Sequence, residues 1–84
     1  MFAVIWRDAA LDSLADAFVT ADLPARDAIE RAVTRLNELL AADADDVGES
    51  RGGQRRIAFE TPCGIRFTVD GPLSTVLVTH FWTY

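Results

Sequence analysis

The chain contains no lysine, so each of its eight positively charged side chains is an arginine. A guanidinium group is planar and stays charged at physiological pH, and its paired donors suit carboxylate and phosphate oxygens. Cysteine occurs only once, at Cys63. A single cysteine excludes an internal disulfide and is typical of proteins from a reducing compartment.

Long apolar runs are also absent. No stretch approaches the roughly 18 residues that a membrane-spanning helix needs, and no basic-then-apolar signal region opens the chain. We therefore expect a cytoplasmic protein without membrane contact. No nucleophile–base pair and no metal-ligand pattern is present, so the sequence predicts no metal site and no cofactor. The 84 residues predict one domain, residues 1–84, with a small core that a partner would stabilise.

Charge is distributed unevenly along the chain. Residues 1–50 hold four arginines against eleven acidic residues, whereas residues 51–84 hold four arginines against two, and the net charge is −5. An acidic chain is a poor general binder of nucleic acid, because affinity for phosphate depends largely on the release of counterions. We expect no strong direct binding of nucleic acid, although the C-terminal half offers a local positive face to an anionic partner.

The N-terminal part of the chain predicts a strand followed by a helix. Residues 2–6 are apolar and aromatic and are typical of a buried strand. Asp8 is a suitable N-cap for a helix that ends near Ala21.

A second helix is predicted directly after the first. Asp22 or Leu23 would cap it, and Pro24 would lie in its first turn, where a missing N–H does no harm. Residues 43–46 are expected in a solvated acidic loop, because carboxylates are repelled by a helix C-terminus. The helical spacing predicts a core-facing stripe of Ile29, Val33, Leu36 and Leu40.

Beyond residue 53 the apolar residues alternate with a period of two, which predicts a three-stranded meander. Pairing Ile57 with Phe67 and Phe59 with Ile65 leaves a five-residue hairpin loop, residues 60–64, which contains Cys63. This register directs Ile57 and Phe59 towards the core and directs Arg56 and Arg66 to the opposite face. A last strand follows in residues 76–82, and the pattern does not define its register.

The predicted fold is α+β with the order β-α-α-β-β-β, in which a helical hairpin packs on one face of an antiparallel sheet. Following the chain direction through the two helices and the meander predicts that the first strand is antiparallel to the last. The other sheet face remains open and carries Arg56 and Arg66.

Several short motifs follow one another in a fixed order. They are the strand ending in Val4-Ile5-Trp6, Gly48-Glu49-Ser50-Arg51, Arg56-Ile57-Ala58-Phe59, and Phe67-Thr68-Val69-Asp70 ahead of Val76-Leu77-Val78. With these motifs the chain resembles the RelE/ParE superfamily, the toxins of bacterial type II toxin–antitoxin modules. The resemblance covers nearly the whole chain and implies a toxin that is neutralised in a hetero-oligomer with its cognate antitoxin.

The resemblance implies two cellular targets. RelE-like members cut messenger RNA in the ribosome with lysines, arginines and a C-terminal tyrosine, whereas ParE-like members lack that set and inhibit DNA gyrase. Arg56 occupies the position of a RelE-like strand arginine and Tyr84 is a terminal tyrosine, but lysine is absent. We favour a ParE-like toxin without enzymatic activity, directed at gyrase or at an unknown target. The alternatives are a ribosome-dependent mRNA endonuclease and a non-toxic binding module of the same fold.

Six residues are candidates for a functional site. In the endonuclease alternative the catalytic residues would be Arg56, Arg66 and His80, since histidine exchanges protons near neutral pH. Phosphate would be bound by Arg51 and Arg55, which flank Gly52-Gly53, with Tyr84 stacking on a base. The structural alternatives are ion pairs of Arg56 and Arg66 with Glu60, a plain turn at residues 52–53, a histidine packed between aromatic rings, and a terminal tyrosine covering the core.

Overall fold

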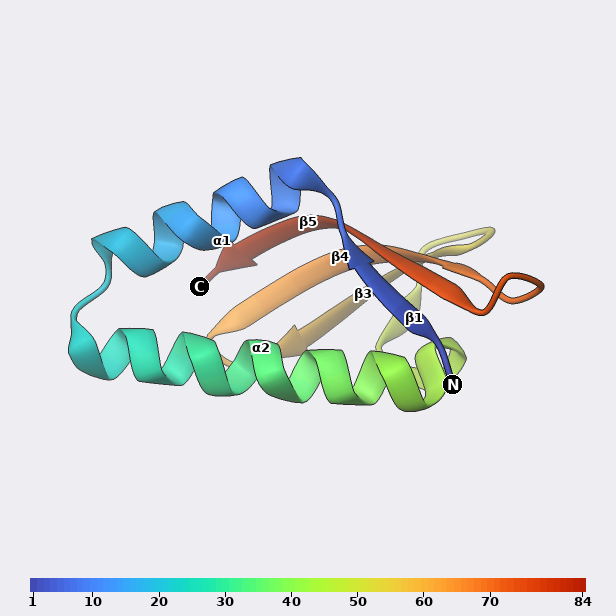
Figure 1. Cartoon of the computed structure of the whole chain (residues 1–84), viewed down its shortest axis with the longest axis horizontal. Helices are drawn as coiled ribbons and strands as arrows, with labels where there is room; N and C mark the ends of the chain where they lie inside the picture. Colours follow the sequence, from blue (N-terminus) through green and yellow to red (C-terminus); the bar gives the residue numbers. More distant parts are fainter.

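The computed structural model describes all 84 residues, and two helices cover one face of a five-stranded sheet (Figure 1). Its elements are β1 (Ala3–Trp6), α1 (Asp8–Thr20), α2 (Leu23–Asp43), a 3₁₀ turn η1 (Ala44–Asp46), β2 (Glu49–Ser50), β3 (Arg55–Glu60), β4 (Cys63–Asp70) and β5 (Thr75–Thr83). The strands lie side by side in the order β1-β5-β4-β3-β2. The predicted α+β class and the helical hairpin on one sheet face are confirmed.

Polar contacts define the turn between the two helices. The carboxylate of Asp22 caps α2 by accepting a hydrogen bond of 3.0 Å from the backbone N–H of Ala25. Arg26, in the first turn of α2, donates to the carbonyls of Phe18 and Val19 at 2.8 and 3.2 Å. The carbonyl of Phe18 also accepts from the backbone N–H of Ala21 at 3.3 Å. Arg26 therefore adds side-chain donors at the C-terminus of α1 and ties the end of one helix to the start of the next.

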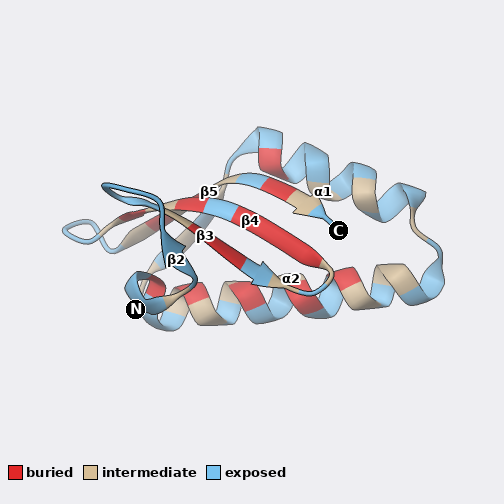
Figure 2. Cartoon of the chain, turned by 180° about the vertical axis from the view of Figure 1, so that it is seen from behind, coloured by how far each residue is buried: buried red, intermediate tan, exposed pale blue.

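The core lies between the helices and the inner face of the sheet. From Ile65 to the end of β4, buried residues alternate with more exposed ones, and α2 presents a buried stripe to the same layer (Figure 2). The largest fully buried side chains of the core are Phe67, Leu36, Leu40, Ile65, Val76, Val78 and Cys63. In the predicted α2 stripe, Ile29, Leu36 and Leu40 are buried and Val33 is half-buried. Neither helix combines the length and hydropathy needed to cross a bilayer.

The direction of β1 differs from the prediction. β1 pairs with β5 in parallel, with Val4 opposite Val76, and not in antiparallel orientation. The cause is β2, a two-residue strand that the sequence pattern does not reveal. β2 forms an antiparallel hairpin with β3, pairing Glu49 with Ile57. This hairpin adds one reversal of the chain before the meander, so β5 runs in the same direction as β1.

The register of β3 also differs from the prediction by one residue. A two-residue turn, Thr61-Pro62, replaces the predicted loop of residues 60–64, and Glu60 pairs with Cys63. Because side chains alternate along a strand, this shift reverses both faces of β3. Ala58 pairs with Ile65 on the core side, whereas Ile57 pairs with Arg66 on the open side. The small alanine faces the helices where α2 contacts β3.

Two local predictions are corrected as well. Asp43 is the last residue of α2 and Asp45 and Asp46 lie in η1, so this acidic segment is helical and not a loop. Cys63 was predicted in a turn, but it begins β4 and is fully buried. The tighter hairpin explains this difference, because it brings the residue after Pro62 into the sheet.

Candidate functional site

A hollow of about 440 Å³ lies on the open face of the sheet, opposite the helices. We call it the arginine hollow. It draws residues from the end of β1, from the β2–β3 connection and from β3, β4 and β5. The residues that border it are Arg7, Arg51, Arg55, Arg56, Arg66, Phe67, Thr68, Thr79 and His80. Five of the eight arginines of the chain therefore gather at one place.

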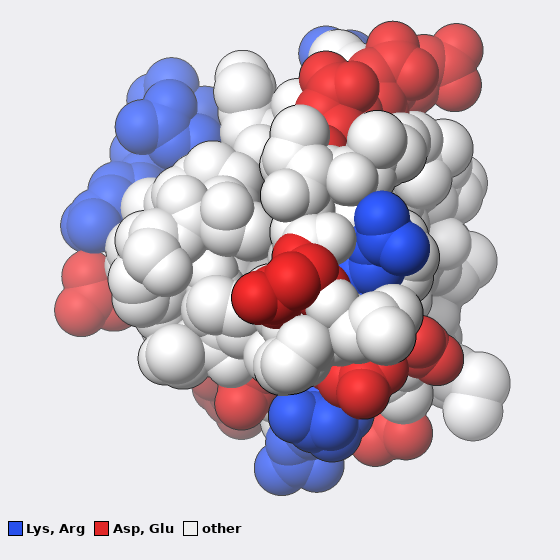
Figure 3. Space-filling view, turned by 90° about the vertical axis from the view of Figure 1, so that its left-hand side faces the viewer, with Lys and Arg blue, Asp and Glu red and all other residues white.

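Only one of the arginines that border the arginine hollow is ion-paired within the protein. None of the bordering residues is acidic. The only ion pair in the structure joins Arg51 to Glu49 at 3.3 Å, between two exposed side chains. By contrast, the end of the molecule at the α1–α2 connection shows separate acidic and arginine groups around a largely uncharged surface (Figure 3). Arg7, Arg55 and Arg66 form no ion pair, and guanidinium groups clustered in this way are suited to binding an external anion, because phosphate fits their paired donors.

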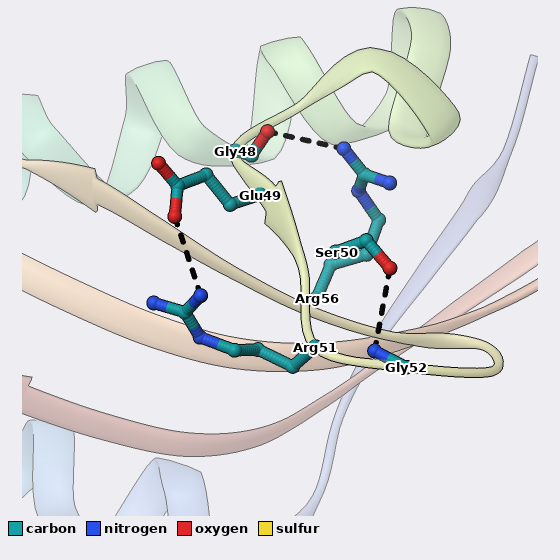
Figure 4. A network of polar contacts seen from close by, with 6 residues as sticks. All are labelled: Gly48, Glu49, Ser50, Arg51, Gly52 and Arg56. Atoms are coloured by element: carbon teal, nitrogen blue, oxygen red, sulfur yellow. Dashed lines mark hydrogen bonds and ion pairs between the residues drawn. The ribbon is translucent and has the colours of Figure 1, made fainter.

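Arg56 has a different role from the predicted one. Since it pairs with the buried Phe67, its side chain leaves the sheet on the side of the helices and not beside Arg66. Its Nε donates to the carbonyl of Val47 at 2.8 Å and its Nη2 to the carbonyl of Gly48 at 3.0 Å (Figure 4). Its guanidinium therefore holds the segment that enters β2, although the residue is also one of those that border the hollow.

The glycine pair at residues 52–53 forms the turn of the β2–β3 hairpin. The backbone N–H of Arg51 donates to the carbonyl of Arg55 at 2.8 Å, and that of Gly52 donates to Ser50 Oγ at 3.3 Å (Figure 4). These internal bonds use two of the backbone donors that a phosphate cradle would need. The turn instead places Arg51 and Arg55 together at one side of the hollow.

A β-bulge directs two consecutive residues of β5 towards the hollow. Arg66 pairs with His80, but Phe67 pairs with Val78, so Thr79 is the extra residue of β5. Bulges of this kind commonly re-aim side chains next to functional sites. In a regular strand, neighbouring residues point to opposite faces, whereas here Thr79 and His80 both border the hollow.

Thr79 also contacts the ring of the histidine. Its hydroxyl lies 3.2 Å from the carbonyl of Arg66, which can only accept, and 3.0 Å from Nδ1 of His80. A hydroxyl carries one proton, so when that proton is donated to the carbonyl of Arg66, Nδ1 of His80 donates to Thr79 Oγ1. Nε2 is then the ring nitrogen with the free lone pair, which is the form of a neutral imidazole that accepts a proton.

The structure therefore brings four of the six candidate residues together: Arg51, Arg55, Arg66 and His80. Tyr84 lies elsewhere, with its hydroxyl 2.9 Å from Thr61 Oγ1 and its ring against Phe59. His80 is exposed at the hollow and is not enclosed by aromatic rings.

Four bordering residues were not among the candidates from the sequence: Arg7, Phe67, Thr68 and Thr79. A signal existed for Arg7, since it follows Ala3 and Ile5 with the parity of the open face of β1, and its N–H bonds to Val78 of β5 at 2.9 Å. No pattern marks the bulge at Thr79. No group of three or more His, Cys, Asp or Glu side chains is arranged to hold a metal ion.

The sequence matches no protein-family model and no curated protein. Similarity appears at the level of structure. The isolated E. coli RelE toxin matches with a TM-score of 0.67 and 14% identity, over 99% of this chain and 84% of RelE. The chromosomal ParDE toxin–antitoxin system of P. aeruginosa matches with a TM-score of 0.62 and 18% identity, over 99% of this chain and 96% of the other. The intact E. coli RelBE toxin–antitoxin complex matches with a TM-score of 0.67 and 14% identity, over 100% and 98%.

Proposed function

Since the chain has the fold of the RelE and ParE toxins, we propose that it is the toxin of a type II toxin–antitoxin module and that it cleaves messenger RNA in the ribosome. One observation carries this proposal: Arg7, Arg51, Arg55, Arg66 and His80 converge on a hollow without an acidic side chain. This clustering favours the endonuclease alternative over a toxin that acts only by binding gyrase.

The chemistry requires a base, charge stabilisation and a strand of RNA. His80 accepts the proton of a ribose 2′-hydroxyl on Nε2, and the 2′-oxygen attacks the adjacent phosphorus. The bond from phosphorus to the 5′-oxygen breaks, and that oxygen leaves with a proton from solvent. The products are a 2′,3′-cyclic phosphate and a 5′-hydroxyl end. Arg66, directly opposite His80 on the neighbouring strand, stabilises the negative charge that develops on the phosphate oxygens.

The ribosome has a clear part in this proposal. With a net charge of −5, the chain lacks the general attraction that would hold naked RNA at physiological salt. A ribosome presents the message as an ordered strand, so the arginine hollow has to bind only a short segment. Weak binding of free RNA is thus an expected property of this site and agrees with the charge of the chain.

Neutralisation by an antitoxin is supported by an apolar groove between the helices. This groove has a volume of about 500 Å³, and seven of its nine lining residues are hydrophobic. Leu11, Phe18 and Val19 line it and remain exposed, Val19 to 72%. A contiguous apolar surface on a chain this small favours a protein partner. We infer that an amphipathic segment of the antitoxin occupies the groove and that toxin and antitoxin form a hetero-oligomer.

The proposal is tested in a reconstituted translation system by mapping the ends of ribosome-bound message. We expect cleavage by the wild type, and a loss of about 10²–10³ in rate for both His80→Gln and Arg66→Ala. Arg35→Ala is the matched control, because Arg35 lies on α2 among acidic side chains and away from the hollow. It should cleave like the wild type.

The contrary results are equally specific. Intact message together with inhibition of DNA gyrase by the wild type would refute the endonuclease and support the ParE-like interpretation. Intact message without gyrase inhibition would favour a non-toxic binding module. If Arg35→Ala lost as much activity as Arg66→Ala, the effect would come from overall charge and not from the hollow.

A further inference from the structure

Three aromatic side chains lie beside the arginine hollow on the open face of the sheet. We call Phe59 of β3, Trp82 of β5 and the terminal Tyr84 the aromatic row. The ring of Phe59 meets Trp82 at a centroid distance of 5.9 Å and Tyr84 at 5.8 Å, both edge to face. Phe59 is 55% exposed and Tyr84 63% exposed. Large exposed apolar side chains that cluster in this way indicate a binding surface.

The sheet is built to hold these rings on its open face. Phe59 pairs with Gly64, and Gly64 pairs with Trp82, so Phe59 and Trp82 lie on either side of Gly64 in one line across β3, β4 and β5. A Cβ atom on Gly64 would lie 2.5 Å from the indole of Trp82. The indole therefore lies directly over the backbone of β4, in space that only a glycine leaves free. The neighbouring Cys63 and Ile65 are fully buried on the opposite side.

The aromatic row and the arginine hollow lie side by side. Arg66 is two residues from Gly64 on β4 and points to the same face, and His80 is opposite Arg66. Two residues of a strand span about 7 Å, so one row of the sheet carries rings and the next carries charge and imidazole. A phosphate bound at Arg66 would bring the nucleotide attached to it within reach of the rings.

We propose that the aromatic row is a stacking platform for a base of single-stranded RNA whose neighbouring phosphate lies in the arginine hollow. The inference rests on the proposed function and adds the surface that binds the base. Aromatic rings next to cationic groups are the common device for binding single-stranded nucleic acid, because every base has a face that stacks. Charge complementarity selects RNA as the occupant, since an apolar protein segment would gain nothing from the adjoining guanidinium groups.

The test uses a trinucleotide with 2′-O-methyl groups, which cannot be cleaved, and matched trinucleotides that lack one terminal base. Binding is followed at low salt by NMR through the two indole N–H signals. Trp82 should shift with the intact trinucleotide. Trp6 is the internal control, because its indole donates to Asn37 at 2.9 Å on the helix side and should not shift. Loss of the stacked base should weaken binding about tenfold.

Variants separate the platform from the phosphate site. Phe59→Ala should abolish the tenfold preference for the intact trinucleotide, whereas Arg66→Ala should weaken all trinucleotides alike. Leu73→Ala removes a side chain of similar exposure in the β4–β5 turn and should change nothing. Thermal melts of the variants establish that each is folded.

The inference is overturned if intact and abasic trinucleotides bind equally, if neither binds at millimolar concentration, or if folded Phe59→Ala keeps the preference. Failure of the platform and failure of the proposed function give different results. Cleavage on the ribosome with no base preference refutes the platform alone. A base preference that depends on Phe59, without any cleavage, supports the platform and refutes the nuclease.

Discussion

The segment that enters β2 offers a sharp test of the fold, through two glycines with similar backbone angles. Gly48 has a φ of +67° and Gly53 a φ of +57°, both in the left-handed region. The space around them differs. A Cβ atom on Gly48 would lie 2.0 Å from the carbonyl oxygen of Ile57 and 2.9 Å from Cβ of Ala58, whereas a Cβ on Gly53 would meet nothing within 4 Å.

The difference in space predicts a difference in stability. Alanine in a left-handed conformation costs about 1–2 kcal/mol, and Gly53→Ala should cost no more than this. Gly48→Ala carries the same conformational cost and, in addition, a collision of the new Cβ with the backbone of β3. A backbone cannot rotate away as a side chain can, and overpacking of this kind costs about 1–3 kcal/mol. Displacement of the segment also weakens the two hydrogen bonds from Arg56 to Val47 and Gly48. We therefore expect a loss of at least about 3 kcal/mol for Gly48→Ala.

Thermal and urea unfolding, followed by circular dichroism, measure this difference. For a domain of this size, 1 kcal/mol corresponds to about 4–8 °C in Tm. Gly53→Ala should thus lower Tm by about 4–16 °C, and Gly48→Ala should unfold at least about 4 °C below Gly53→Ala. Equal melting points for the two variants would refute the close approach of Gly48 to β3 and, with it, the role of Arg56 as a clamp.

Two further predictions concern ionisable groups. Burial raises the pKa of Cys63 to about 11, so at pH 8 only about one thiol in a thousand is ionised. Iodoacetamide should modify the native protein no faster than it unfolds, and rapid alkylation of folded protein would contradict this. Asp43 has a pKa raised above 3.8, chiefly by its hydrogen bond with Asp46 and then by repulsion from that residue. Since the folded state holds a proton that the unfolded state releases, stability is lost as pH rises through the folded pKa of Asp43. Asp43→Asn should therefore raise Tm more at pH 7 than at pH 3.5. An equal gain in Tm at both pH values would show that the contact between the carboxyl groups of Asp43 and Asp46 does not raise the pKa of Asp43.

The sequence by itself determined the two helices, the longer strands and the layer arrangement. The spacing of Ile29, Leu36 and Leu40 requires a helical face to bury, and Asp22 supplies the cap that starts that helix. The alternation of Ile65, Phe67 and Val69 requires a strand with one buried side. These signals are periodic and repeat over several residues, so a single exception does not obscure them.

Only the tertiary structure decided which residues share the open face. The two-residue turn at Thr61-Pro62 sets the register of β3, and a change of one residue there exchanges Arg56 for Arg55 on the open face. β2, with two residues, reverses the direction of every later strand and makes β1 parallel to β5.

The functional face depends on contacts between residues far apart in the chain. Arg7 joins the arginine hollow because β1 lies next to β5, and the bulge at Thr79 directs His80 to Arg66. The parity of β1 indicates the face to which Arg7 points, but it does not indicate which strand lies beside β1. The bulge has no local signal, because a bulge is set by pairing with the neighbouring strand and not by the period of one segment. The sequence thus determined that arginines would lie on an open sheet face, and the pairing of the strands decided which ones meet.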